Sequence, residues 1–193
     1  MPLISRSLTV LLVGALWVCP VDAQLEGVVT LKVALKEMLQ SKGAKSLKKR
    51  SLVLDKAKQE AMQKQYGFAP NAKYTVYTGL DAEKEPIGSA VVVDIEGKEG
   101  PLQLVVALDH TQGAVYNLCF TVFGEERGKP AAKKTFLKQF IGFDAQNKFK
   151  LGKDVDGVSG ATWTSTSVTE AIQHAVAVFD YFIHAPAAVS KEE

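Results

Sequence analysis

The chain has 193 residues, of which 47% are hydrophobic and 23% charged, which is enough apolar material to bury one compact core. This composition excludes an intrinsically disordered chain, and a net charge of +2 excludes binding to a polyanion by bulk charge. Two cysteines are present, without a Cys-x-x-Cys-His sequence for haem or a cysteine cluster for an iron–sulfur centre.

The first 23 residues are typical of a secretory signal peptide. Arg6 supplies a positive charge, residues 8–18 form an apolar core, and small residues precede a cleavage site after Ala23. The apolar run is shorter than the about 20 residues that span a bilayer. A lipoprotein site at Cys19 is the alternative, but the two residues before it are large. We therefore expect export to the periplasm or another extracytoplasmic location.

Residues 24–72 are expected to form a helical prefix. Apolar residues recur at helical spacing over residues 28–40, and Asp55 is a candidate N-cap for a second helix over residues 56–65. A basic run between them is expected to be a solvated helix end or loop, with contact to acidic lipid headgroups or a partner as the alternative. The run consists of Lys45, Lys48, Lys49 and Arg50.

Residues 73–185 are expected to form the main domain, followed by a disordered tail over residues 186–193. Four segments rich in β-branched and aromatic residues predict an antiparallel meander. They cover residues 73–78, 87–95, 102–108 and 114–123. Cys119 lies in the last of them, where a buried inert thiol is expected. The predicted fold is therefore α+β, with an antiparallel, half-barrel-like sheet, packed helices and a single domain behind the helical prefix.

A charged turn over residues 124–130 follows the last strand, and residues 131–140 predict a short helix. The closing helix is expected from about Thr164 to Ile183, because apolar residues recur there at steps of three and four. The three histidines have no metal-ligand spacing and are expected at the surface, so no metal site and no catalytic residue is predicted.

The stretch before that helix reads Asp156-Gly157-Val158-Ser159-Gly160-Ala161-Thr162. Its small residues allow another molecule to approach the backbone, and its hydroxyl residues favour a helix start. Free N–H groups at a helix start attract anions, so a phosphate group is the expected ligand. A threonine that only caps the helix is the alternative.

This heptad resembles the FMN-binding domain family, whose members carry Asp-x-x-(Ser/Thr)-Gly-Ala-Thr. They include the flavin-bearing G subunit of Rnf complexes and the C subunit of sodium-pumping NADH:quinone reductases. The resemblance implies FMN joined through its phosphate to the hydroxyl of Thr162 by a separate magnesium-dependent transferase that uses FAD. It also implies a transferase recognition stretch of Asp156, Ser159, Gly160 and Ala161. A weaker resemblance runs through residues 136–142.

The resemblance says less about the flavin ring. Many relatives carry a Glu-Thr-Pro-Gly type turn close to the flavin, which residues 126–128 match only in part. Glu126 is therefore a candidate ring contact, with an exposed charged turn as the alternative. Trp163 is a candidate to stack on the ring or shield it, with simple packing as the alternative, and Thr164 is a candidate phosphate contact.

These expectations combine into an exported electron-transfer flavoprotein that shuttles electrons between membrane or extracytoplasmic redox partners. Such a protein is an electron carrier or redox subunit rather than a stand-alone enzyme. One alternative is a flavin-free or loosely flavin-binding sensory or scaffold module that contacts a membrane partner. Another is a secreted binder of a small hydrophobic ligand.

Overall fold

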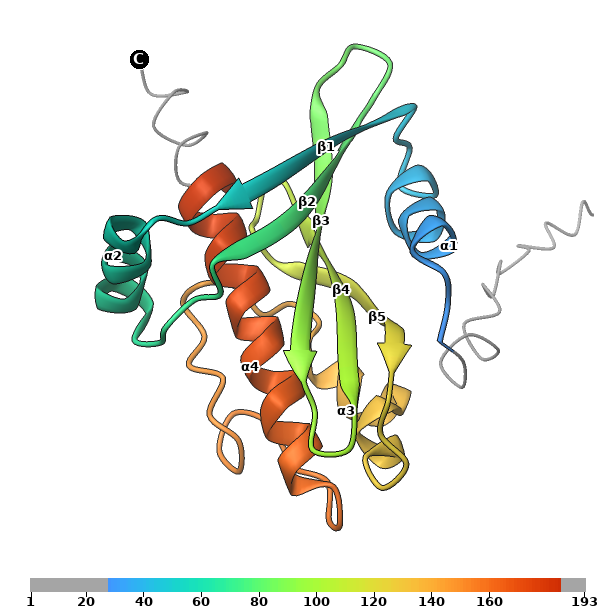
Figure 1. Ribbon diagram of the computed structural model, residues 1–193. Coiled ribbons are helices and arrows are strands. Elements are labelled where there is room, and N and C mark those ends of the chain that lie inside the picture. The colour runs from blue at the N-terminus through green and yellow to red at the C-terminus, as the bar shows by residue number, and fades with distance from the viewer. Residues whose placement is uncertain (1–27, 185–193) are drawn as a thin grey trace, which may run out of the picture.

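The computed structural model describes residues 28–184 (Figure 1). Its centre is one open, five-stranded antiparallel sheet in the order β1-β2-β3-β4-β5, so each strand pairs with its neighbour in the chain. The strands are β1 (Ser46–Val53), β2 (Lys73–Leu80), β3 (Pro86–Glu96), β4 (Pro101–Asp109) and β5 (Val115–Phe123). The predicted α+β class and antiparallel meander are confirmed. The expected signal peptide and disordered tail lie outside the described residues.

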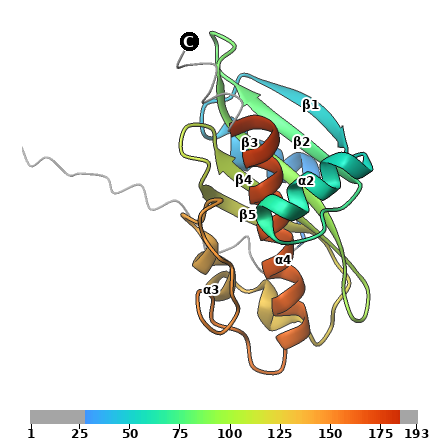
Figure 2. The same ribbon diagram turned by 90° about the vertical axis from the view of Figure 1, so that its left-hand side faces the viewer.

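Helices cover both faces of this sheet. The long helix α4 (Thr162–Phe179) packs on one face, and α1 (Leu31–Leu35) continues into the π-helical turn η2 (Lys36–Gln40) on the other (Figures 1 and 2). Two hydrophobic cores result, one on each face of the sheet. Successive side chains of β3 point alternately into the two cores, because side chains on a strand alternate between its faces. Val91 and Val93 face the α4 core, whereas Ala90 and Val92 face the α1 core.

The prefix contains its two expected helices. Thr30 caps the first, because its hydroxyl accepts a hydrogen bond from the N–H of Val33 at 3.4 Å. The second, α2 (Lys56–Tyr66), begins at the expected N-cap, where the Asp55 carboxylate accepts from the N–H of Lys58 at 2.9 Å. It ends at Gly67, which takes a left-handed φ of 80°.

The prefix also contains a strand where the sequence predicted a helix end or loop. All of the basic run except Lys45 lies in β1, which pairs antiparallel with β2 from Ser46 opposite Leu80 to Val53 opposite Lys73. The residues of β1 before Leu52 are all exposed, and β1 is an edge strand of the sheet. Lysines suit this position, since charged side chains discourage further strand pairing.

Between β5 and α4 the chain forms short turns rather than the single expected helix. They are η3 (Lys129–Ala132), α3 (Lys134–Leu137) and η4 (Lys138–Phe140). Phe136, Leu137 and Phe140 are buried and anchor this segment in the α4 core. A loop over residues 141–161 then leads back to the start of α4, which places that helix end beside the α3 region (Figure 2).

Candidate functional site

The helix that follows the heptad begins at Thr162, two residues earlier than predicted. Ala161 is the N-cap residue and has no side chain that can satisfy the first amides. Gly160 precedes it with a φ of 79°, a conformation that strongly favours glycine. Within the described chain, no acceptor satisfies the backbone N–H groups of residues 162–164. The start of α4 therefore offers open donors and the positive end of a long helix to an anion.

The predicted cofactor-binding residues divide into an exposed and a buried group. Thr162, Ser159 and Gly160 are exposed, and Trp163 exposes 62% of its surface. Ala161 and Thr164 are buried. The hydroxyl of Thr162 thus faces solvent. Thr164 can contribute its backbone amide to an anion site at the helix start, but not its buried side chain.

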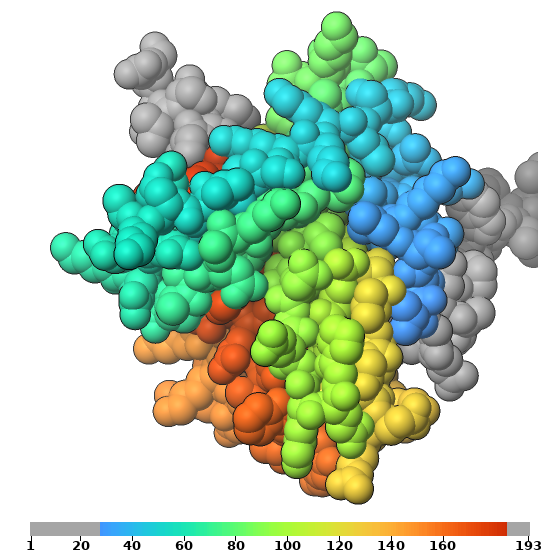
Figure 3. Space-filling view, in the orientation of Figure 1, coloured from blue at the N-terminus to red at the C-terminus, as the bar shows by residue number. Residues whose placement is uncertain are grey.

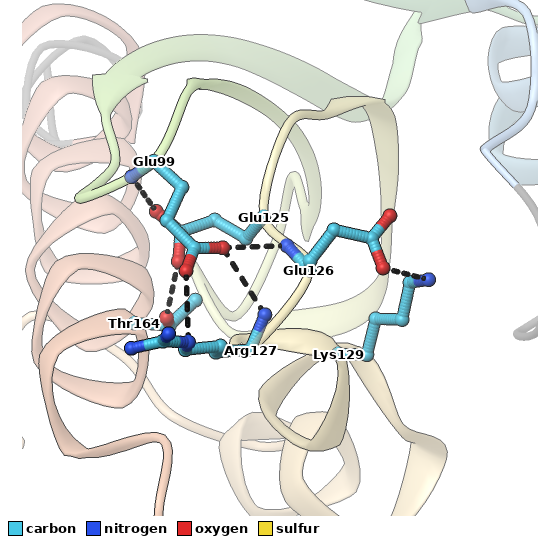
Figure 4. Close-up of polar contacts among 6 residues, drawn as sticks. All are labelled: Glu99, Glu125, Glu126, Arg127, Lys129 and Thr164. Carbon is cyan, nitrogen blue, oxygen red and sulfur yellow. Dashed lines mark hydrogen bonds and ion pairs between the residues drawn. The ribbon is translucent and has the colours of Figure 1, made fainter.

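The hydroxyl of Thr164 points to a carboxylate that the sequence did not single out. It donates a hydrogen bond of 2.9 Å to Oε2 of Glu125, whose residue is only 3% exposed (Figure 4). The other carboxylate oxygen, Oε1, accepts from the backbone N–H of Glu99 at 3.0 Å. Glu125 therefore joins three segments at the start of α4: the β3–β4 turn, the turn after β5 and the helix itself.

Two glycines allow this close approach. A Cβ on Gly97 would lie 2.3 Å from Oε1 of Glu125, and one on Gly128 would lie 2.4 Å from the Thr164 hydroxyl. Glu125 and Gly128 have the Glu-x-x-Gly spacing of the turn found in relatives, one residue earlier than the partial match that drew attention to Glu126. That spacing is the signal by which Glu125 could have been found.

Glu126 itself is exposed, and its carboxylate forms an ion pair of 2.6 Å with Lys129 (Figure 4). Its backbone N–H donates to Oε2 of Glu99 at 2.8 Å, as does that of Arg127 at 3.1 Å. These bonds from Arg127 and Glu126 lower the pKa of Glu99, which therefore stays ionised. Its carboxylate links the β3–β4 turn to the turn after β5. Glu126 therefore lies outside the buried network, and its role as a contact of the flavin ring stays a prediction.

Asp156 is the first residue of the heptad and is held by a different segment of the chain. Its backbone is bonded to the side chain of Gln139, while its own carboxylate is exposed. Further along, the N–H of Val158 donates to the Ser165 hydroxyl at 3.3 Å. The loop is thus fixed at Asp156 and Val158, while Gly157, Ser159 and Gly160 are exposed.

A groove of about 590 Å³ runs along α4, between the helix and the β3–β4 hairpin (Figure 3). Ser167, Glu170 and His174 line its helix side, at the three- and four-residue steps that share one helix face. Trp163 lies four residues before Ser167 and so belongs to the same face. The exposed tryptophan therefore continues the wall of the groove toward the helix start.

Over residues 28–184, no group of three or more His, Cys, Asp or Glu side chains could hold a metal ion. The helices of this same region include none that is both long and apolar enough to cross a membrane.

The fold and this site define an α+β domain that presents a small-residue loop and an open helix start to an anionic group. Residues 97–177 match the model of the FMN-binding domain family, which confirms the resemblance seen in the heptad. The matched segment contains the β3–β4 turn, Glu125, Gln139 and the whole heptad.

Two solved structures are similar to this chain. The C subunit of the Na⁺-translocating NADH-quinone reductase from Parabacteroides distasonis is 19% identical with a TM-score of 0.50, over 80% of this chain and 85% of that one. NqrC from Shewanella oneidensis is 22% identical with a TM-score of 0.48, over 75% and 85%. The Parabacteroides structure shows a shared fold. No match was found among curated proteins.

The residues present fit the phosphate end of FMN. The exposed hydroxyl of Thr162, the unsatisfied amides after Ala161 and the bare backbone at Gly160 all lie at one helix start. An anion there gains from the helix dipole, by about 0.3–1 kcal/mol at an exposed site. This is too little to retain a dissociable cofactor in dilute solution, so the helix start is suited to orienting the phosphate.

Proposed function

We propose that this protein is an exported electron-transfer flavoprotein whose FMN is joined by a phosphoester to the hydroxyl of Thr162. The observation that carries the proposal is the placement of Thr162. It is the last residue of a complete family heptad and the first residue of α4, with an exposed side chain and open amides beside it. Ser159, Gly160, Ala161 and Trp163 would surround the phosphate end of the cofactor.

Covalent attachment suits an exported carrier, because a cofactor that dissociated outside the cytoplasm would be lost. In the attachment step, the threonine oxygen forms a bond to the phosphorus on the riboflavin side of FAD, the pyrophosphate P–O bond breaks, and AMP leaves. The threonine proton passes to a base of the transferase, whose magnesium ion neutralises the phosphate charge. Asp156 would be read by that enzyme as part of the recognition stretch.

Bound FMN supplies reversible acceptance and release of electrons, and the protein supplies its position and surroundings. Glu125 and Thr164 make the start of α4 rigid, and the groove beside Trp163 gives an adjoining surface of mixed polarity. The donor and acceptor would be a membrane or extracytoplasmic redox partner. The fold shared with the Parabacteroides NADH-quinone reductase protein supports that role, as does the expected signal peptide.

The test is the mass of the acid-denatured polypeptide after co-expression with a flavin transferase. We expect an increment equal to FMN minus water, and yellow colour that stays with the denatured chain. Thr162→Ala should lack both. The matched control is Thr166→Ala, because Thr166 is the exposed threonine one helical turn later and its hydroxyl bonds only to the Thr162 carbonyl.

The outcomes separate the proposed function from its alternatives. An unmodified wild-type chain that binds FMN weakly, or not at all, would favour the sensory or scaffold module. A colourless protein with no flavin signal on addition of dithionite would favour a binder of small hydrophobic ligands. Modification that persists in Thr162→Ala would place the attachment elsewhere.

A further inference from the structure

The segment of residues 136–142 has no role in the attachment described above. Phe136, Leu137 and Phe140 are at most 2% exposed and pack in the core under α4. Gln139 lies among them and is half-buried, so the backbone that carries its side chain is fixed by the core on both sides. A polar residue held in this way needs hydrogen-bond partners.

Gln139 finds both partners on the first residue of the heptad. Its Oε1 accepts from the backbone N–H of Asp156 at 2.8 Å, and its Nε2 donates to the Asp156 carbonyl at 3.2 Å. The orientation of the amide follows from chemistry, because a backbone N–H can only donate and a carbonyl can only accept. One side chain therefore satisfies both polar backbone groups of one residue, as a neighbouring strand would.

These bonds matter because the heptad is intrinsically loose. Gly157 and Gly160 give it more unfolded conformations than other residues would. Beyond Asp156, the nearest anchors are two bonds at Val158 and the first turn of α4. The Val158 N–H donates to the Ser165 hydroxyl at 3.3 Å, and its carbonyl accepts from the Ala161 N–H at 3.0 Å. Without Gln139, the chain before Val158 would depend on Val155, which is buried beside the loop.

We propose that Gln139 is a positioning residue, which holds Asp156 and the heptad in the conformation that the flavin transferase recognises. The inference rests on the proposed attachment at Thr162. A loop that spends only a fraction of its time in the competent conformation binds its enzyme more weakly by that fraction. Loss of the two bonds should therefore raise the KM of the transferase for this chain and leave kcat nearly unchanged.

The variant Gln139→Leu keeps the side-chain volume and removes both bonds. Gln139→Glu keeps an acceptor for the Asp156 N–H but sets an oxygen opposite the Asp156 carbonyl, so it should be intermediate. Gln146→Leu is the matched control, an exposed glutamine ten residues before Asp156 in the same loop. Rates of the mass increment are measured with purified transferase, FAD and Mg²⁺ over a range of chain concentrations. We expect Gln139→Leu to raise KM about three- to tenfold, as befits two neutral hydrogen bonds in part-exposed surroundings.

A second measurement needs no flavin. Hydrogen–deuterium exchange of the unmodified chain should show the Asp156 amide protected in wild type and Gln146→Leu, and unprotected in Gln139→Leu. A raised KM without a change in exchange would mean that Gln139 contacts the transferase directly, which overturns the positioning role. If wild type is modified and Gln139→Leu has the same KM, this inference alone fails. If wild type is never modified, the attachment at Thr162 fails as well.

Discussion

His174 lies in the middle of α4 and is half-buried, although the sequence predicted a surface side chain. Its ring stacks on Phe68 with centroids 4.2 Å apart, and its Nδ1 lies 3.3 Å from the hydroxyl of Tyr74. The backbone N–H of Asn71 donates to that hydroxyl at 2.7 Å, which leaves the phenol proton available for Nδ1. The arrangement thus favours a neutral imidazole with its own proton on Nε2, and burial lowers the pKa of His174 to about 4.

This pKa predicts an acid-sensitive fold. The unfolded chain takes up the proton near pH 6.5, whereas the folded chain resists it until about pH 4, so the unfolded state binds more protons between those values. The free energy of unfolding should fall as the pH drops through this window, by at most about 3 kcal/mol for this group. Urea titrations from pH 7 to pH 4.5 measure the loss.

His174→Phe keeps an aromatic ring against Phe68 and cannot titrate, so its stability should decline less over the same pH range. His184→Gln serves as the control, because His184 is bonded to Asp180 and the Thr111 carbonyl at the far end of the helix. An acid limb of equal slope in wild type and His174→Phe would contradict the assignment.

Cys119 is the second residue whose surroundings set its chemistry. It is half-buried against the α1 core, and burial, with a smaller contribution from the charge of Glu37, raises its pKa to about 12. At pH 8 the native thiolate fraction should be about three orders of magnitude below that of a free cysteine with a pKa of about 8.5. Iodoacetamide should therefore alkylate the native chain far more slowly than the urea-denatured chain. Similar rates in the two states would show that the thiol is accessible and ionisable.

At the scale of single elements, local signals predicted most of the fold. The N-cap at Asp55 marked the start of α2, and the stripe of apolar residues predicted α4, because both signals depend on residues a few positions apart. The strand β1 was missed because Lys48, Lys49 and Arg50 show no apolar alternation. They are a strand only because their backbone pairs with β2, a contact between distant residues.

The candidate site shows the same division. The heptad is contiguous, so a helix start close to its hydroxyl residues could be predicted from the sequence. The early helix start was missed because Ala161, rather than a hydroxyl residue, is the N-cap. Glu125 and Gln139 were missed because their partners, Thr164 and Asp156, lie 39 and 17 positions away in the chain. The Glu-x-x-Gly spacing marks Glu125 within its turn, but nothing local marks its contact with Thr164 or the contact of Gln139 with Asp156.

The buried network at Glu125 gives a prediction at this scale. In Gly128→Ala, the new Cβ would lie 2.4 Å from the Thr164 hydroxyl and 2.8 Å from Oε2 of Glu125. Either the turn shifts or the hydrogen bond breaks, so the free energy of unfolding should fall by about 2–3 kcal/mol. Chemical denaturation measures the change. Gly157→Ala is the control, since its Cβ would meet only Leu151 at an ordinary 3.6 Å, and equal stability of the two variants would exclude a tight network at Gly128.

For the molecule as a whole, the prefix and the main domain share one sheet. The family match covers residues 97–177 and so includes β4, β5 and most of α4 but not β1, β2 or β3. β3 is buried on both faces, which requires the prefix helix on one side as much as α4 on the other. Met38 and Leu39 of that helix are at most 3% exposed, and the Met38 carbonyl accepts a hydrogen bond from the Tyr116 hydroxyl at 2.9 Å. The expected boundary at residue 73 therefore cuts through packed structure.

A fragment of residues 73–184 should consequently not fold as a monomer. It would expose the apolar face that α1 and η2 cover and leave the edge of β2 without β1, and an exposed apolar strand edge promotes aggregation. A fragment of residues 28–184 keeps α1, η2 and β1 and is the matched comparison. Size-exclusion chromatography and thermal unfolding followed by circular dichroism should give a cooperative monomer for the longer fragment, and aggregates or a broad transition for the shorter. A monomeric 73–184 fragment that melts within a few degrees of the longer one would contradict this prediction. The α1 core would then contribute little to the stability of the sheet, and residues 73–184 would fold independently of the prefix.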